Sequence, residues 1–177
     1  MIRINSKIWD RLKEVATEQE LPAKHTLLRE GEVSNTIYLI KNGCLRLCFN
    51  NDGKDVTFQF FFEGDAVSSI ESFWADQASM FSLETIEAST ILVVSKKDFQ
   101  RVVNGSNETK ELVNQHIFQR LITYQKLFLS RIKEKPQERY EQLLTHNPDI
   151  FNRIPQHYIA SYLGITSVSL SRIRNRK

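Results

Sequence analysis

The stretch Thr36–Phe61, TIYLIKNGCLRLCFNNDGKDVTFQFF, decides the fold of the first half of the chain. Its β-branched and aromatic residues come in short runs with a period of two, which indicates strands. Asn42-Gly43 and Asp52-Gly53 interrupt these runs, and both dipeptides favour the tight turns of β-hairpins. The same pattern continues to about Phe99, with a further pair of strands in TIEASTILVVS. We therefore expect a β-sandwich, a jelly roll or a barrel.

The residues on the N-terminal side of these strands predict an amphipathic helix. Ser6 is followed by KIWDRLKEVAT, in which the apolar residues fall on one helical face, and Leu21-Pro22 would end the helix. The apolar residues of this face are Trp9, Leu12, Val15 and Ala16.

A long helix is predicted after Asn104-Gly105-Ser106, and Pro136 would end it. Its apolar residues recur every three or four positions, and Phe118, Ile122 and Leu129 widen the stripe. Such a wide stripe has two interpretations: packing on its own domain alone, or a seam with a second copy of the helix in a short coiled coil. We favour the seam, with Val113, Ile117, Leu121, Tyr124 and Phe128 as its residues.

The last residues, IPQHYIASYLGITSVSLSRIRNRK, predict two short helices joined by a glycine turn. Pro155 suits the first turn of a helix, and Gly164 suits the left-handed conformation that closes it. Thr166 or Ser167 would cap the second helix. Apolar residues on one face of each helix would form the shared core, namely Ile159, Ala160, Leu163, Leu170 and Ile173. This is the pattern of a helix-turn-helix unit, whose second helix enters the major groove of DNA.

The polar positions of the second helix are the candidate DNA contacts. Arg172 has the side chain for a bidentate contact with guanine, and Val168 could contact a thymine methyl group. We expect Ser167, Val168, Ser169 and Arg172 to read bases. Arg174, Arg176 and Lys177 would contact phosphates. The alternative is an ordinary helical hairpin with a solvated basic end.

The composition of the 177 residues is that of a globular protein, with 41% hydrophobic and 25% charged residues. The net charge of +3 does not by itself indicate nucleic-acid binding, but its distribution is uneven. Residues 65–95 contain five carboxylates and no Lys or Arg, whereas the cations gather at the C-terminus. No apolar run approaches the ~20 residues of a membrane helix, and no secretory signal is visible. We expect a cytoplasmic protein without membrane contact.

The order of these parts resembles the Crp/Fnr family of bacterial transcription regulators over essentially the whole chain. The residues that carry the resemblance are LLREGEVSNTIYLIKNGCLRL, GKDVTFQFFFEGD and IASYLGITSVSLSRIR, and SYLGIT…SLSRIR is similar to the Bacteroidetes branch. The resemblance implies an α+β chain with a β-roll sensor domain of jelly-roll type (1–104), a dimerisation helix (105–135) and a helix-turn-helix DNA-binding domain (136–177). It also implies a homodimer on a two-fold-symmetric DNA site, with RNA polymerase as a candidate partner.

Two features depart from the family pattern. A β-hairpin wing often follows the reading helix, so either this branch lacks the wing or the sequence is shortened. The other departure is the cassette that binds the phosphate of cyclic AMP in related sensors. Its Gly-Glu and Arg-Ser pairs are replaced here by Ser68-Ser69 and Ser82-Leu83. The remaining effector-pocket candidates are Ser68, Ser69, Glu71 and Ser82.

A buried phosphate needs a cation or a helix N-terminus, and this cassette contains no cation. We therefore do not expect cyclic AMP as the effector. One alternative is that a cation such as Arg46, or one from the partner's central helix, reaches into the pocket.

Other sensor and enzyme chemistries lack their residues. Cys44 and Cys48 are too few for an iron–sulfur cluster, and we expect them in the core. The four histidines show no metal-ligand spacing, and none lies between His25 and His116. Haem on His116 is a weaker hypothesis than a satisfied or solvated histidine. No G-x-S-x-G elbow or phosphate-binding glycine loop occurs, so we expect neither an enzyme nor a metal or cofactor site.

Two other functions stay open at this point. The β-domain could bind a small ligand while the last helices dock on a protein, although four cations without an acid argue against protein docking. The chain could also bind DNA without sensing a ligand, under the control of its abundance or of a partner protein.

Overall fold

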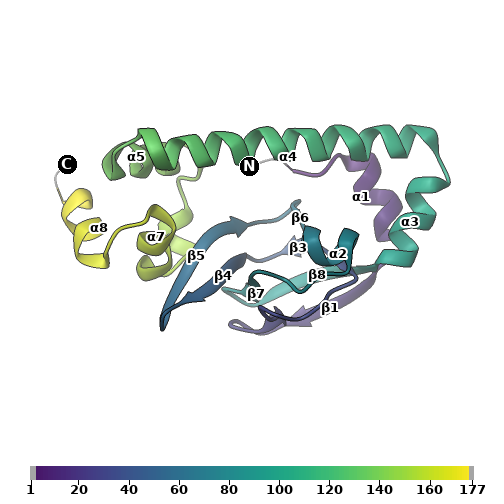
Figure 1. Ribbon diagram of the computed structural model, residues 1–177, viewed down its shortest axis with the longest axis horizontal. Helices are drawn as coiled ribbons and strands as arrows, with labels where there is room; N and C mark the ends of the chain where they lie inside the picture. Colours follow the sequence, from purple (N-terminus) through teal and green to yellow (C-terminus); the bar gives the residue numbers. More distant parts are fainter. Residues whose placement is uncertain (1–2, 176–177) are drawn as a thin grey trace.

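Two four-stranded antiparallel sheets lie beneath one long helix (Figure 1). The computed structural model describes residues 3–175. The strand orders are β1-β8-β3-β6 and β2-β7-β4-β5, so the predicted β-roll is confirmed. The strands are β1 (Thr17–Leu21), β2 (Thr26–Leu28), β3 (Thr36–Asn42), β4 (Leu45–Asn51), β5 (Lys54–Phe61), β6 (Ala66–Val67), β7 (Ser82–Thr85) and β8 (Ser89–Ser95).

The two faces of β4 belong to different hydrophobic cores. Leu45 and Leu47 point into the roll, where they pack with residues of both sheets such as Ile91. Cys44, one position before the strand, packs instead with the C-terminal helices. Side chains alternate between the two faces of a strand, so neighbouring residues of β4 belong to different cores. The first four residues of β4 are therefore buried on both faces.

Gly43 lies where the chain turns between β3 and β4. Its φ is +104°, and a Cβ atom at this position would lie 2.2 Å from Ser89 Oγ. Both the backbone conformation and the close approach of β8 therefore require glycine.

The N-terminal helix is shorter than predicted. α1 (Ser6–Lys13) begins after the N-cap Asn5, not Ser6, and buries Ile8 and Leu12. The residues that follow form β1, although the prediction continued the helix to Leu21-Pro22. The five backbone pairs that β1 makes with β8 outweigh the weak local preference of a polar sequence.

The remaining helices begin after β8. α3 (Lys96–Asn104), which the period-two reading missed, is capped by Ser95 and packs beside α4. α4 (Asn107–Lys133) follows the N-cap Ser106 and runs along most of the molecule (Figure 1). Its 27 residues span about 40 Å. The others are α2 (Ile70–Ala75), α5 (Pro136–His146), α6 (Ile150–Arg153), α7 (Gln156–Leu163) and α8 (Ser167–Arg174).

The C-terminal helices form one end of the molecule, beyond the β4-β5 side of the roll (Figure 1). α7 packs directly on β5. Phe60 and Phe62 share a core with Leu163 and Leu170, so the two parts have a common hydrophobic boundary. None of the helices within residues 3–175 combines the length and apolar character required to cross a bilayer.

Candidate nucleic-acid interface and sensor pocket

α7 and α8 are joined by the predicted glycine turn. Gly164 adopts φ +70° at the end of α7, and its N–H donates to Ser161 O at 2.9 Å. Thr166 then caps α8, because its Oγ accepts the Ser169 N–H at 3.1 Å. The residues predicted for the shared core are buried, except that Ile173 is half-buried; the fully buried ones are Ile159, Ala160, Leu163 and Leu170.

α8 presents a short polar face to the solvent. Ser167, Val168 and Arg172 are exposed, and Val168 keeps 61% of its surface. Ser169, predicted to read bases, is half-buried, and its hydroxyl lies 3.0 Å from Thr166 Oγ. Its first role is therefore in the helix cap, because Ser and Thr side chains compete for the free N–H groups at a helix start.

The charged residues of α8 itself, Arg172 and Arg174, are both positive. No Asp or Glu follows Asp149 in the sequence. Arg174 is exposed and lies 4.8 Å from the Phe151 ring centre, which orients its guanidinium while leaving it accessible. Arg176 and Lys177, the other predicted phosphate contacts, lie outside the described residues.

Arg46 lies on the face of the roll that α7 covers. Its side chain is 5% exposed and contacts carboxylates of Asp55 and Glu84, each at 2.7 Å. It also donates to Thr57 Oγ at 2.8 Å and lies 4.0 Å from the Tyr158 ring centre. We call Arg46, Asp55, Thr57, Glu84 and Tyr158 the Arg46 cluster. The cluster explains why the charged Arg46 lies between two buried residues, Leu45 and Leu47. In the sequence, a charged residue between two apolar strand positions was the one indication that such a cluster exists.

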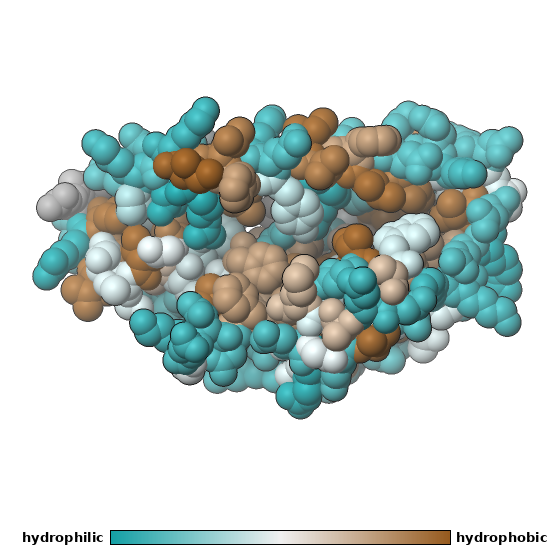
Figure 2. Space-filling view, in the orientation of Figure 1, coloured by the Kyte–Doolittle hydropathy of each residue, from teal (hydrophilic) through white to brown (hydrophobic). Residues whose placement is uncertain are grey.

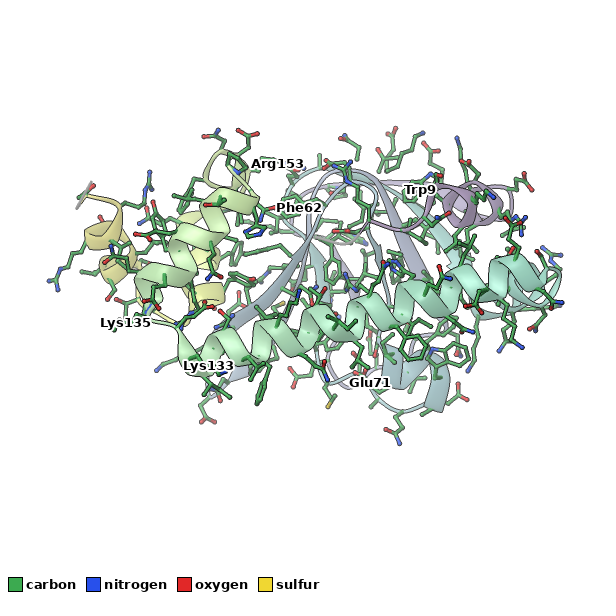
Figure 3. All side chains as sticks on the ribbon, turned by 90° about the horizontal axis from the view of Figure 1, so that it is seen from above. Trp9, Phe62, Glu71, Lys133, Lys135 and Arg153 are labelled. Carbon is green, nitrogen blue, oxygen red and sulfur yellow. The ribbon has the colours of Figure 1, made fainter. Side chains whose placement is uncertain are left out.

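Two further residues of the C-terminal helices, Ser161 and Arg153, contact the roll at the same boundary. Ser161 Oγ of α7 accepts the Thr57 N–H at 2.9 Å. Arg153 of α6 forms ion pairs with Glu63 and Glu87 of the roll and lies beside Phe62 (Figure 3). The Arg153 guanidinium lowers the pKa of Glu63 against the opposing effect of burial. These pairs join residues up to 104 positions apart, so no local sequence pattern indicates them.

The predicted effector-pocket residues have different surroundings. Ser82 Oγ accepts the Glu30 N–H at 3.0 Å, and Glu71 accepts the Met80 N–H at 3.0 Å. Ser69 is buried without a partner for its hydroxyl among the described residues. Ser68 lines an apolar cavity of about 270 Å³ between α2 and α4.

Arg46 does not supply the missing phosphate cation. It lies on the outer face of β4, opposite to the roll interior, and is already paired with two carboxylates. The cation nearest to the apolar cavity is Arg120 of α4, whose guanidinium lies 5.1 Å from the Phe61 ring centre. The cavity therefore receives a cation from α4, and none from residues 65–95 themselves.

The apolar stripe on α4 is largely uncovered. Ile117, Leu121, Tyr124 and Phe128 are all exposed, the last with 66% of its surface. Figure 2 shows hydrophobic surface along the edge that α4 forms. Val113 was predicted as part of the seam, but it is buried in the core of its own chain, because α4 rests there on α1 and α3.

The cysteines and histidines have structural environments. Cys44 and Cys48 are buried, as predicted, and burial raises the pKa of both thiols, that of Cys48 to about 12. His116 is half-buried, and burial together with the nearby Arg120 lowers its pKa. Within residues 3–175, no three potential metal ligands converge.

The architecture is thus a β-roll followed by a long helix and a pair of short helices joined by a glycine turn. Residues 18–106 match the cyclic nucleotide-binding domain family, and the chain belongs to this family. No curated protein matches the chain in sequence.

Solved structures share the whole architecture. FixK2 of Bradyrhizobium japonicum has a TM-score of 0.76 at 17% identity, covering 92% of this chain and 84% of its own. CLP of Xanthomonas campestris, described as a c-di-GMP responsive global regulator, has a TM-score of 0.71 at 13% identity, covering 97% and 91%. A CooA mutant of Carboxydothermus hydrogenoformans has a TM-score of 0.69 at 21% identity, covering 93% and 77%. The predicted family resemblance is thus confirmed for the sensor domain and for the fold; the Bacteroidetes branch stays a prediction.

Proposed function

We propose that this chain is a sequence-specific DNA-binding transcription regulator in the cytoplasm, with RNA polymerase as a candidate partner. The observation that carries the proposal is the exposed face of α8, where Arg172 projects from a capped helix in a segment free of carboxylates. A helix in this position can enter the major groove, and an arginine there can pair with guanine. The description of CLP as a global regulator is consistent with this function.

In this proposal Ser167, Val168 and Arg172 face the bases. Ser169, whose hydroxyl and N–H take part in the helix cap, lies near the bases as well. Arg174, together with Arg176 and Lys177, contacts the DNA backbone and supplies affinity that falls with salt. In the same proposal residues 1–104 act as the sensor, residues 105–135 as the dimerisation helix and residues 136–177 as the DNA-binding domain.

The active form in this proposal is a homodimer joined along α4. The exposed stripe on α4 lies beside Ile70 and Trp74 of α2, both more than half exposed, so a second copy would cover a continuous apolar groove. Covering it would remove these side chains from water at about 25 cal/mol per Å² of apolar surface. Two copies related by a two-fold axis would read a two-fold-symmetric site.

The effector is not cyclic AMP in this proposal, although the domain belongs to a cyclic nucleotide-binding family. The cassette has no cation to compensate a buried phosphate, and Arg46 is already paired outside the roll. Addition of 1 mM cyclic AMP should leave the unfolding midpoint within about 1 °C, because an effector stabilises only the state that binds it. A clear rise in the midpoint would contradict this part of the proposal.

Selection of binding sites from a random DNA library tests the function. The purified protein should enrich one motif with two-fold symmetry and half-sites about one helical turn apart. Enrichment of a single asymmetric half-site would contradict the dimer but keep the DNA binding. Failure to enrich any motif, together with capture of a protein on the same helices, would favour a signalling module that docks on a protein.

A further inference from the structure

A second, larger cavity lies at the junction of the roll and the DNA-binding domain. Its volume is about 550 Å³, and it is bounded by the C-terminal half of α4, the end of β5, α5 and α7. In Figure 3 its labelled wall residues are Phe62 of the roll and Lys133 near the end of α4. This size is within the usual range of small-molecule sites. It is separate from the predicted effector pocket, because it is lined by none of Ser68, Ser69, Glu71 and Ser82.

The charges on its walls are mainly positive. Five Lys and Arg side chains line the cavity, against two carboxylates, those of Asp65 and Glu134. Glu134 already accepts a hydrogen bond from the Ser130 hydroxyl. Asp65 is 2% exposed, and burial raises its pKa. The cationic residues are Arg120, Lys126, Arg131, Lys133 and Arg139.

Two of these arginines converge on the turn between α7 and α8. Arg139 donates to Leu163 O at 2.8 Å and to Glu134 O at 2.6 Å, which accounts for two of its nitrogen atoms. Arg131 lies 5.2 Å from the Tyr162 ring centre, and its Nη1 would be 3.3 Å from a Cβ on Gly164. Burial, and then the positive charge of Arg139, lowers the pKa of Arg131. Among the described residues, no carboxylate forms an ion pair with either arginine.

Unpartnered polar atoms are concentrated around the same cavity. Residues 3–175 contain six buried side-chain nitrogen or oxygen atoms without a hydrogen-bond partner, and four of them belong to residues that line it. Three are acceptors: Gln59 Oε1, Asp65 Oδ1 and Asn147 Oδ1; the fourth is the donor Arg139 Nε. Such atoms cost free energy unless a partner is supplied.

We propose that this cavity binds a small aromatic anion: a phosphate or carboxylate group on a flat ring that carries N–H donors. Arg131 and Arg139 would hold the anion, since paired guanidinium groups suit planar or phosphate oxygens. Phe60, Phe62 and Tyr162 would contact the ring. The three unpartnered acceptors would receive the N–H donors.

The cavity lies where a bound molecule would affect the placement of the roll relative to the C-terminal helices. Its walls come from both sides of the short connection between α4 and α5, so a bound molecule would bridge the roll and the DNA-binding helices. Binding would then stabilise this relative placement of the two parts. The site stands independently of the DNA-binding proposal, because its ligand can be measured without DNA.

Four probes separate the parts of the proposed ligand. The probes 4-aminophenyl phosphate and 4-aminobenzoate carry the ring, the N–H donors and one of the two anionic groups. Inorganic phosphate lacks the ring, and aniline lacks the anion. At ten times its dissociation constant, a bound probe raises the thermal midpoint by roughly 3–6 °C for a chain of this size. We expect this shift with at least one aromatic anion and with neither fragment.

Variants of the wall residues locate the binding. Arg131→Gln should weaken binding of the aromatic anion, measured by calorimetry, by about 10- to 100-fold, as expected for loss of a charge-assisted hydrogen bond. Lys133→Gln is exposed and safe for folding, and it should weaken binding by roughly two- to threefold. The control is Lys135→Gln, which loses the same charge two positions further along but does not line the cavity (Figure 3).

Each outcome of these measurements either supports or overturns the proposed site. Weaker binding in Arg131→Gln and Lys133→Gln, with normal binding in Lys135→Gln, supports the site. The proposal is overturned if neither aromatic anion binds the wild-type protein at 10 mM. Equal binding by the wild-type and wall variants would also overturn it, since the ligand would then lie elsewhere.

Discussion

The substitution Glu84→Gln tests whether the Arg46 cluster stabilises the fold. Glu84 Oε2 accepts hydrogen bonds from Arg46 Nε at 3.2 Å and from Nη2 at 2.7 Å, while the Arg46 side chain is 5% exposed. Gln keeps the size and one acceptor but removes one of two negative charges. Removal of one partner of a fully buried pair costs about 3–5 kcal/mol. Because Asp55 remains and Glu84 is 25% exposed, we expect a loss of about 2 kcal/mol.

Urea unfolding measures this loss. With a slope of about 2 kcal/mol per M, the midpoint should fall by about 1 M. The thermal midpoint should fall by roughly 4–8 °C. The matched control is Glu18→Gln, which breaks the ion pair with Lys41 on an exposed strand, where both side chains are nearly half exposed. Exposed pairs contribute about 0–1 kcal/mol, so the control should change little. Equal losses in the two variants would refute the reasoning.

Three more predictions concern the seam, the turn and the thiols. The double variant Leu121→Glu/Phe128→Glu should be a monomer in sedimentation velocity. Both side chains are exposed on the apolar stripe of α4, and a dimer would have to bury the new charges. A dimer that persists would place the seam elsewhere. Gly164→Ala should destabilise the DNA-binding helices by about 1–2 kcal/mol, since φ is +70° there, and hydrogen exchange in α7 and α8 should rise; unchanged exchange would count against a strained turn. Cys48 should react with a thiol reagent at pH 8 about a thousandfold slower than a free cysteine, because burial raises its pKa to about 12. Cys44 should also react slowly, because burial raises its pKa as well. Rapid labelling of the folded protein would show that β4 opens.

The sequence was most informative where one local rule dominates. The stripe of α4 has the period of a helix over 27 residues, and Ser106 and Pro136 mark its ends. Gly164 closes α7 in the left-handed conformation, as predicted from its position after an apolar face. In these places the propensity, the pattern and the cap agree, so the local sequence is sufficient.

The failures come from partners that are distant in sequence. Thr17–Leu21 is polar and gave no strand signal; it is a strand because it pairs with β8, more than 60 positions later. Val113 has the same spacing as Ile117, yet it meets α1 and α3 instead of solvent. Periodicity shows which residues share a face but not what covers that face.

The candidate site also has a part that the local sequence predicted and a part that it did not. The exposed positions of α8 follow from the helix pattern, except for Ser169, whose hydroxyl is used by the cap. The contacts of Arg46, Arg131 and Arg153 across the domain boundary did not follow from the pattern, because each joins residues from separate elements. A buried charge between apolar strand positions predicts that a partner exists without identifying it.

The central claim, that α8 reads DNA sequence, is tested most directly by one comparison. The affinity for the selected DNA site is measured by fluorescence anisotropy for the wild-type protein, Arg172→Ala and the control Lys97→Ala. Lys97 is an exposed cation on α3, at the opposite end of the molecule (Figure 1). We predict that Arg172→Ala weakens binding to the selected site by about 5- to 150-fold while binding to random DNA changes far less. Lys97→Ala should bind the selected site normally. Wild-type affinity in Arg172→Ala would contradict the claim.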